Sequence, residues 1–168
     1  QRTAFNDRRA EMIAASIRRT IRAGCWLMLA AGVLAVTALA ADLRPFTAKS
    51  LAEIRQTHAG KPFVLAFWSI HCAPCKEEMA LLTSLHRKFP GVPIVLVATD
   101  PPSEKTAIDR FLARHDLGRM GTWIFADEFT ERVRFSVDRS WRGELPKTYF
   151  FDATHAPAFA QIEGLAID

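Results

Sequence analysis

Residues 61–79 read KPFVLAFWSIHCAPCKEEM, and the change of pattern inside this stretch decides the fold. Val64 to Trp68 is a short apolar run with aromatic residues, which is typical of a buried strand. After Cys72 the apolar residues recur at helical spacing: Met79, Leu82, Leu85 and Phe89. Cys72 and Cys75 therefore lie where a predicted strand leads into a predicted helix.

The rest of the chain also alternates between strand and helix patterns. We expect strands at 93–98 and 122–126, helices at 50–60, 103–115 and 128–137, and a final hairpin that pairs 147–152 with 158–163. Ser50 and Glu53 have the spacing of a capping box at the start of the first helix. The order predicts an α/β fold with a central mixed sheet, flanked by helices and ending in a C-terminal β-hairpin.

The net charge of the chain is concentrated at its N-terminal end. The whole chain carries +4, but residues 1–41 hold six arginines and two acidic residues, so residues 42–168 balance 16 basic against 16 acidic side chains. A neutral domain without a basic stripe lacks the electrostatic attraction that dominates nucleic-acid affinity. The sequence therefore predicts no nucleic-acid partner.

Residues 1–41 have the pattern of a targeting segment, followed by one domain at 42–168. Arg18, Arg19 and Arg22 precede nineteen residues without a charge, 23–41, which contain the A-x-A cleavage pattern at 38–40. The apolar length also approaches that of an uncleaved membrane anchor, so a signal peptide and an anchor through 23–41 both remain open. Because the positive charges precede the apolar run, either outcome places 42–168 outside the cytoplasm, in the periplasm or cell envelope.

Cys72 and Cys75 form the cysteine pair of the exported domain, because Cys25 lies in the apolar segment. A C-x-x-C in an oxidising compartment can be a structural staple, part of a metal site or a redox couple. A staple across so short a loop restrains little of the unfolded chain. A structural zinc site normally needs four ligands, and neither a second C-x-x-C nor a pair of histidines follows. These arguments favour a redox couple and no metal.

The position of the pair predicts how the two thiols differ. Unpaired N–H groups and the helix dipole favour negative charge at a helix N-terminus, which lowers the pKa of a thiol there. Cys72 is therefore the expected attacking thiol, and Cys75, one turn further in, is the expected resolving thiol. His71 and Lys76 add positive charge nearby.

Two motifs resemble those of a known family. FVLAFWSIHCAPCKEEM is similar to the active-site strand and helix of thioredoxin-fold proteins, and ELPKT at 144–148 is similar to their loop with a cis-proline. Together with the export signal, these motifs resemble the TlpA/ResA group of envelope protein disulfide reductases. The resemblance covers about 61–163.

The resemblance implies roles for individual residues. It again makes Cys72 the attacking and Cys75 the resolving thiol, with Pro74 as a constraint on the loop between them. Pro146 would be the cis-proline that faces the pair, and the backbone of Leu145 would receive an extended substrate. The residues expected to support the site are Trp68, His71, Pro74 and Lys76.

The resemblance also implies an activity, with alternatives. The chain would reduce disulfides in exported proteins with no cofactor besides its own redox-active disulfide, and a membrane electron donor of the DsbD type would recharge it. Apocytochrome c, a copper-site dithiol in an oxidase subunit and an oxidised Dsb-type partner are possible substrates. Ala73-Pro74 favours a reductase over an oxidase or isomerase. A copper-handling protein, with His155 as a third ligand beside the cysteines, is the alternative of another class.

The sequence departs from the family pattern at several positions. Ala66 stands where thioredoxins carry a buried acid, so the usual proton acceptor is missing. His71 replaces a common Trp, and Ala80 replaces a common helix proline. After Gly164 only LAID follows, where the family has a further helix that covers one face of the sheet.

Overall fold

The computed structural model describes residues 43–161, so the predicted signal or anchor at 1–41 and the last residues, 162–168, lie outside the described residues. The elements are β1 (Arg44–Phe46), α2 (Ser50–Thr57), β2 (Phe63–Trp68), α3 (Ala73–Lys88), β3 (Ile94–Ala98), the 3₁₀ helix η1 (Pro102–Glu104), α4 (Lys105–Arg114), β4 (Gly121–Phe125), α5 (Thr130–Val137), β5 (Lys147–Phe151) and β6 (Pro157–Gln161). No helix between 43 and 161 is long and apolar enough to cross a membrane.

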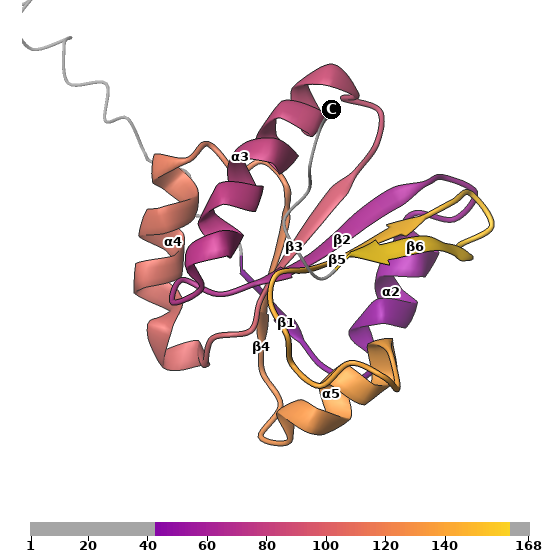
Figure 1. The fold of residues 1–168 in the computed structure, drawn as a ribbon. Helices are drawn as coiled ribbons and strands as arrows, with labels where there is room; N and C mark the ends of the chain where they lie inside the picture. Colours follow the sequence, from indigo (N-terminus) through magenta and orange to yellow (C-terminus); the bar gives the residue numbers. More distant parts are fainter. Residues whose placement is uncertain (1–42, 162–168) are drawn as a thin grey trace, which may run out of the picture. The chain divides into compact units, whose positions relative to one another are not determined.

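The strands form one mixed sheet in the order β1-β4-β3-β2-β5-β6 (Figure 1). The pairs β1–β4, β4–β3 and β3–β2 are parallel, whereas β5 runs antiparallel to both β2 and β6. The structure confirms the predicted α/β fold with a central mixed sheet flanked by helices, and this is a thioredoxin-like fold. The carboxyl end of β2, the carboxyl end of β4 and the start of β5 lie at the same edge of the sheet.

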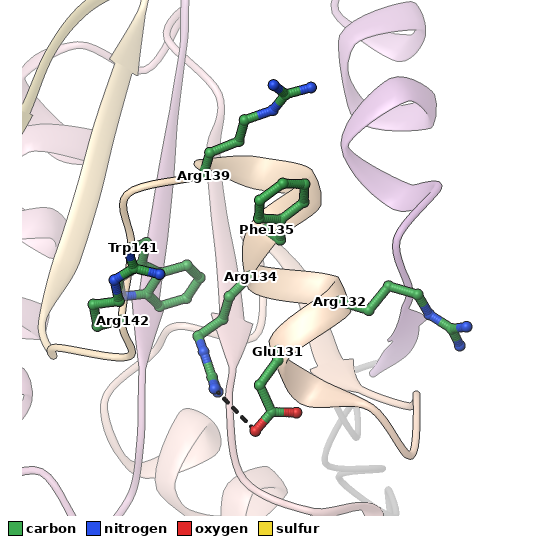
Figure 2. Close-up of a pocket in the computed structure, with 7 residues that line it drawn as sticks. All are labelled: Glu131, Arg132, Arg134, Phe135, Arg139, Trp141 and Arg142. Atoms are coloured by element: carbon green, nitrogen blue, oxygen red, sulfur yellow. Dashed lines mark ion pairs between the residues drawn. The ribbon is translucent and has the colours of Figure 1, made fainter.

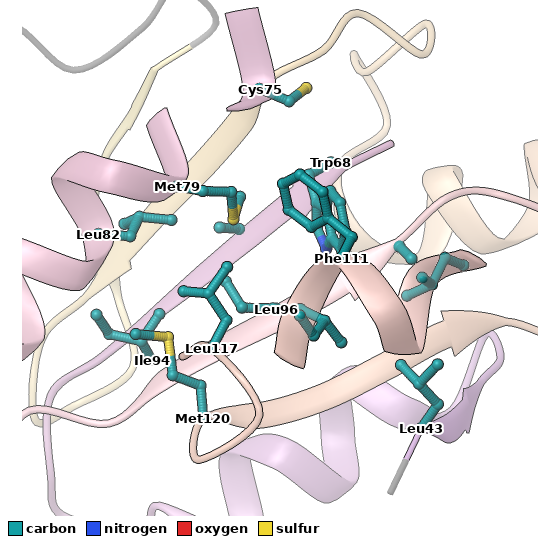
Figure 3. Packing of buried hydrophobic residues seen from close by; sticks show 14 of the residues in the cluster. Leu43, Trp68, Cys75, Met79, Leu82, Ile94, Leu96, Phe111, Leu117 and Met120 are labelled. Atoms are coloured by element: carbon teal, nitrogen blue, oxygen red, sulfur yellow. The ribbon is translucent and has the colours of Figure 1, made fainter. Parts of the chain in front are cut away.

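Strand β2 is buried on both faces, which explains its unbroken apolar sequence. Its alternate residues Val64, Ala66 and Trp68 contribute to one cluster, which we call the α3 core. Other members of the α3 core come from α3, α4 and β3 (Figure 3): Met79, Leu82, Ile108, Phe111, Leu112, Ile94, Leu96 and Ala98.

The intervening residues of β2 face the opposite layer. Phe63, Leu65 and Phe67 belong to a second cluster, the α2 core, which α2 and α5 cover. The other members of this cluster include Phe46, Leu51, Ile54, Trp123, Phe125, Val133, Trp141, Tyr149 and Phe151. Two apolar layers therefore enclose the sheet, with α3 and α4 on one side and α2 and α5 on the other (Figure 1).

The expected capping box at Ser50 is wrong. Lys49 is the N-cap of α2, and no side chain caps this helix. The hydroxyl of Ser50 instead accepts a hydrogen bond from the backbone N–H of Thr47 at 2.9 Å, while Glu53 reaches Arg44 at 3.6 Å. Ser50 is buried, so its hydroxyl stabilises the turn between β1 and α2 rather than the helix start.

Two other elements differ from the sequence-based expectation. Strand β1 was not predicted, because its three residues at the sheet edge, Arg44–Phe46, are too few to show an alternating pattern and include a proline. The expected helix at 103–115 is divided into η1 and α4. Pro102 opens η1, since a first turn needs no N–H from that position.

Candidate active site

The two cysteines close the start of α3 in a disulfide. The S–S distance is 2.05 Å and the two Cα atoms lie 5.3 Å apart. Cys72 is the N-cap of the helix, and its sulfur accepts a hydrogen bond from the backbone N–H of Cys75 at 3.2 Å. The predicted junction of strand and helix is therefore confirmed. The N–H that contacts the Cys72 sulfur is one that would stabilise a thiolate after reduction.

The two sulfur-bearing residues differ in accessibility. Cys72 is partly exposed, whereas Cys75 is fully buried in the α3 core. An incoming disulfide can therefore reach Cys72 first, and Cys75 can act only from inside the helix. The roles of attacking thiol for Cys72 and resolving thiol for Cys75 stay a prediction, which this difference in accessibility supports.

The predicted supporting residues near the cysteine pair differ in burial. Trp68 is fully buried at the end of β2 and packs against Phe111 with ring centroids 5.0 Å apart. Pro74 lies in the first turn of α3, where a backbone N–H would have no partner within the helix, so a proline costs no hydrogen bond there. Lys76 is exposed on the same helix.

His71 and two acidic residues brace the loop before Cys72. His71 Nε2 lies 2.8 Å from Glu104 Oε2 at the surface. Asp100 is buried, and its two carboxylate oxygens accept hydrogen bonds from the Ser69 hydroxyl at 2.7 Å and the Ile70 N–H at 3.2 Å. The ligand atoms of His71, Asp100 and Glu104 lie within 4.8 Å of one another, a spacing that a divalent cation could bridge. In the structure His71 bonds to Glu104, and Asp100 bonds to the loop, so we assign these groups a bracing role.

The loop before β5 brings the second motif to the same site. The Leu145–Pro146 peptide bond is cis, as the sequence predicts. Leu145 packs against the α3 core, as Cys72 does, and it also packs against the α2 core. The indole N–H of Trp141 donates to the carbonyl of Glu144 at 2.9 Å, which fixes the loop just before Leu145. The loop and the redox pair therefore share one apolar layer.

Glu78 is a site residue that sequence reasoning missed. It lies one turn after Cys75 on α3 and is only 2% exposed. Its Oε1 accepts a hydrogen bond from the Thr148 hydroxyl at 2.9 Å, and among the described residues its Oε2 has no hydrogen-bond partner. Burial raises the pKa of the Glu78 carboxyl above its usual value. The available signal was a charged residue on the buried stripe of an amphipathic helix, beside Met79 and Leu82.

The hydrogen bond from Thr148 holds the Glu78 carboxyl near Ala66, the position at which this sequence lacks the buried acid of thioredoxins. Ala66 and Thr148 are direct partners in the antiparallel pairing of β2 with β5. Side chains of direct partners lie on the same face of a sheet. The Glu78 carboxyl therefore approaches the sheet beside the small side chain of Ala66, and an acid from α3 occupies the region that an acid from β2 would otherwise fill.

Comparison with known proteins agrees with this geometry. Residues 37–156 match the family described as AhpC/TSA. The chain is similar to proteins named thiol-disulfide oxidoreductase ResA: it is 28% identical over 90 residues to the one from Bacillus thuringiensis subsp. konkukian and 29% identical over 91 residues to the one from Oceanobacillus iheyensis. Each match covers 54% of this chain, and 43% and 44% of the respective relatives. The chain thus matches less than half the length of these relatives.

Solved structures show the same fold. A secreted disulfide oxidoreductase from Mycobacterium tuberculosis, described as homologous to DsbE of E. coli, matches with a TM-score of 0.54 and 21% identity over 66% of this chain and 78% of that one. A secreted thiol-disulfide isomerase from Corynebacterium glutamicum matches with a TM-score of 0.56 and 20% identity over 66% of each chain. At this identity the likeness shows the fold alone.

Proposed function

The chain belongs to the AhpC/TSA family, and from that premise we propose that it is an extracytoplasmic thiol-disulfide oxidoreductase that reduces disulfides in exported proteins. The observation that carries the proposal is the Cys72–Cys75 disulfide at the start of α3, with one residue partly exposed and the other buried. The ResA relatives, which are named thiol-disulfide oxidoreductases, support the activity, and the targeting pattern of residues 1–41 supports the location.

The reaction proceeds in two exchanges. The Cys72 thiolate of the reduced protein attacks one sulfur of the substrate disulfide, which forms a mixed disulfide and releases one substrate thiolate. Cys75 then loses its proton and its thiolate attacks the Cys72 sulfur. This second step forms the Cys72–Cys75 bond and releases the other substrate thiolate. Two electrons have passed from the cysteines to the substrate.

Glu78 is the proposed proton acceptor for Cys75. The two residues are one turn apart on α3, where side chains three positions apart lie on the same face. Because burial raises its pKa, the Glu78 carboxyl can hold a proton closer to neutral pH than an exposed glutamate can. The oxygen of Glu78 that Thr148 does not contact is the one able to receive that proton.

Regeneration requires an external reductant, because the proposed compartment is oxidising. We assign this role to a membrane electron donor of the DsbD type. An exported apocytochrome c or an oxidase subunit with a copper-site dithiol is the kind of substrate that such a reductase would serve. The segment 23–41 would provide membrane contact if it stays uncleaved.

The copper-handling alternative needs His155 as a third ligand, but His155 lies far from the cysteines. His155 packs against Phe63 at the start of β2, with ring centroids 5.3 Å apart, and its Nε2 lies 3.0 Å from the carbonyl oxygen of His58. Cys72 follows the opposite end of β2, and a strand of this length spans about 17 Å. His155 therefore cannot join the cysteines on one metal ion.

The direction of electron flow is tested by the equilibrium reduction potential of the Cys72–Cys75 pair in the full chain, with the fluorescence of the nearby Trp68 as the reporter. A potential near or below about −230 mV is expected for a reductase. A potential near about −120 mV would identify an oxidase and contradict the proposed direction.

A further inference from the structure

A pocket of about 460 Å³ lies between α5 and the loop that leads to Leu145 (Figure 2). Four of its lining residues are arginines, and a single acidic residue, Glu131, joins them: the arginines are Arg132, Arg134, Arg139 and Arg142. Figure 2 shows Arg139 next to Phe135, Arg142 next to Trp141, Arg134 turned toward Glu131 and Arg132 pointing away from the others. The proposed redox chemistry does not use these guanidinium groups.

Two of the arginines are already neutralised, and two are not. Arg132 binds both carboxylate oxygens of Asp127, at 2.8 and 2.9 Å, and Arg134 lies 3.5 Å from Glu131. Among the described residues, Arg139 and Arg142 have no ion-pair partner, and both are exposed. The pocket therefore offers two guanidinium groups that have no ion pair among the described residues, and the planar fork of each matches the carboxylate geometry.

The pocket also has an aromatic wall. Phe135 is 56% exposed, and the Arg139 guanidinium lies 5.3 Å from the centre of its ring. The Trp141 ring lines the pocket but is only 4% exposed, because most of its surface belongs to the α2 core. An occupant must therefore present an apolar group beside its negative charges. Aromatic residues and arginine are both enriched at protein interfaces.

Trp141 connects the pocket to the redox site. Its indole N–H holds the Glu144 carbonyl, and Leu145, the next residue, packs against the same apolar layer as Cys72. Trp141 and Leu145 are four residues apart, so their Cα atoms are at most about 14 Å apart. An extended polypeptide that pairs with Leu145 would reach the pocket within about four of its own residues.

Hydrogen bonds hold residues 138–141, which form one wall of the pocket. Asp138 accepts hydrogen bonds from the Ser140 N–H at 2.8 Å and the Tyr149 hydroxyl at 3.0 Å. The backbone N–H of Trp141 donates to the Asp138 carbonyl at 3.1 Å. These bonds attach the wall to strand β5, so little conformational entropy is lost when an occupant orders the loop.

We propose that this pocket binds an acidic stretch of the substrate protein, two carboxylates flanking an apolar side chain, located within about four residues of the segment that pairs with Leu145 beside the attacked cysteine. Arg139 and Arg142 bind the carboxylates, and Phe135 contacts the apolar side chain. This inference rests on the proposed reductase function and adds a substrate class to it. The chain selects disulfides whose flanking sequence is acidic.

The test uses the reduced full chain in single-turnover exchange with synthetic peptides, each closed by one disulfide. One peptide carries Glu-Leu-Glu within four residues of the cysteine, and its counterparts carry Gln-Leu-Gln or Lys-Leu-Lys. Each triplet is placed on either side of the cysteine in separate peptides. The rate as a function of peptide concentration gives the half-saturating concentration. The variants are Arg139→Glu/Arg142→Glu and the control Arg119→Glu, an exposed arginine in the loop before β4.

We expect the wild-type chain to half-saturate with the Glu peptide at a lower concentration than with the Gln peptide. The double reversal should raise the half-saturating concentration for the Glu peptide about tenfold, as expected when two exposed ion pairs become two repulsions. It should also lower that concentration for the Lys peptide. Arg119→Glu should change none of these values, and added salt should reduce the differences.

Two results would overturn the inference while leaving the reductase function intact. One is equal half-saturation for the Glu and Gln peptides in the wild-type chain. The other is an Arg119→Glu effect as large as that of the double reversal. Tight binding of inorganic phosphate with no preference among the peptides would assign the pocket to a free anion instead. Failure to reduce any peptide, and 2-hydroxyethyl disulfide as well, would refute the proposed function and this inference with it.

Discussion

The hydroxyl of Thr148 donates a hydrogen bond of 2.9 Å to the buried carboxylate of Glu78, from a position 70 residues later in the chain. Thr148 pairs directly with Ala66, the position at which thioredoxins carry their buried acid. The hydrogen bond connects the helix that begins at the cysteine pair to the strand after the cis-proline, and strand pairing places both beside the strand before the cysteines. The acid is supplied by α3 in place of β2.

Glu78→Gln should slow the resolving step. The amide keeps the shape and can still accept from Thr148, but it cannot take the Cys75 proton. We expect the conversion of the mixed disulfide to the Cys72–Cys75 disulfide to slow about 10²-fold, the lower end for a lost general base. Quenched single-turnover exchange measures this rate. Glu77→Gln, at the exposed neighbouring position, is the matched control, and equal rates in the two variants would remove Glu78 from the mechanism.

The same substitution should change how stability depends on pH. Because burial raises the pKa of Glu78, the folded chain binds this proton more tightly than the unfolded chain does. That stabilisation is complete below the ordinary glutamate pKa and is lost as the pH rises through the raised value. Between about pH 4 and about pH 8, the melting temperature of Glu78→Gln should therefore rise relative to wild type. Thermal unfolding at both pH values checks this, and a constant difference would contradict it.

Asp100→Ala should destabilise the loop that carries Cys72. It leaves the Ser69 hydroxyl and the Ile70 N–H without their acceptor in a largely buried position, which costs about 1–3 kcal/mol. Glu104→Gln breaks an exposed pair with His71, worth at most about 1 kcal/mol. Urea unfolding of the two variants gives the comparison. Equal losses would show that Asp100 does not brace the loop.

Gly143→Ala should strain the loop before the cis-proline. Gly143 has φ +111°, a conformation that a residue with a Cβ rarely adopts. We expect a loss of about 1–3 kcal/mol in the free energy of unfolding. Gly91→Ala is the control, because φ there is not in the positive region and nothing lies within 4 Å of an added Cβ. If the two variants unfold alike, Gly143 is not needed for the backbone conformation of this loop.

The elements that the sequence predicted are those with strong local patterns. The apolar run of β2 and the helical spacing after Cys72 predicted the redox centre, because burial on both faces of a strand and one face of a helix leaves a direct trace in the sequence. β1 left no such trace. The capping box predicted at Ser50 was wrong because the Ser50 hydroxyl bonds to the turn before the helix rather than to the helix itself.

The rest of the site depends on contacts between distant segments. Glu78 gains its role from Thr148, and no local pattern shows that these two residues meet. The arginine pocket likewise forms only when α5 and residues 139–142 fold against the sheet. The alternative in which His155 is a third copper ligand fails for the same reason, since the distance of His155 from the cysteines is a property of the fold.

The most direct test of the account is capture of the mixed disulfide with the Cys75→Ser variant of the full chain, in which Cys25→Ser removes the third thiol from every variant. The reduced variant is incubated with a disulfide-containing exported protein and then treated with a thiol-blocking reagent. The account predicts a covalent adduct through Cys72 that dithiothreitol releases and that Cys72→Ser/Cys75→Ser does not form. The absence of an adduct, or an adduct that survives in the double variant, would contradict Cys72 as the attacking thiol.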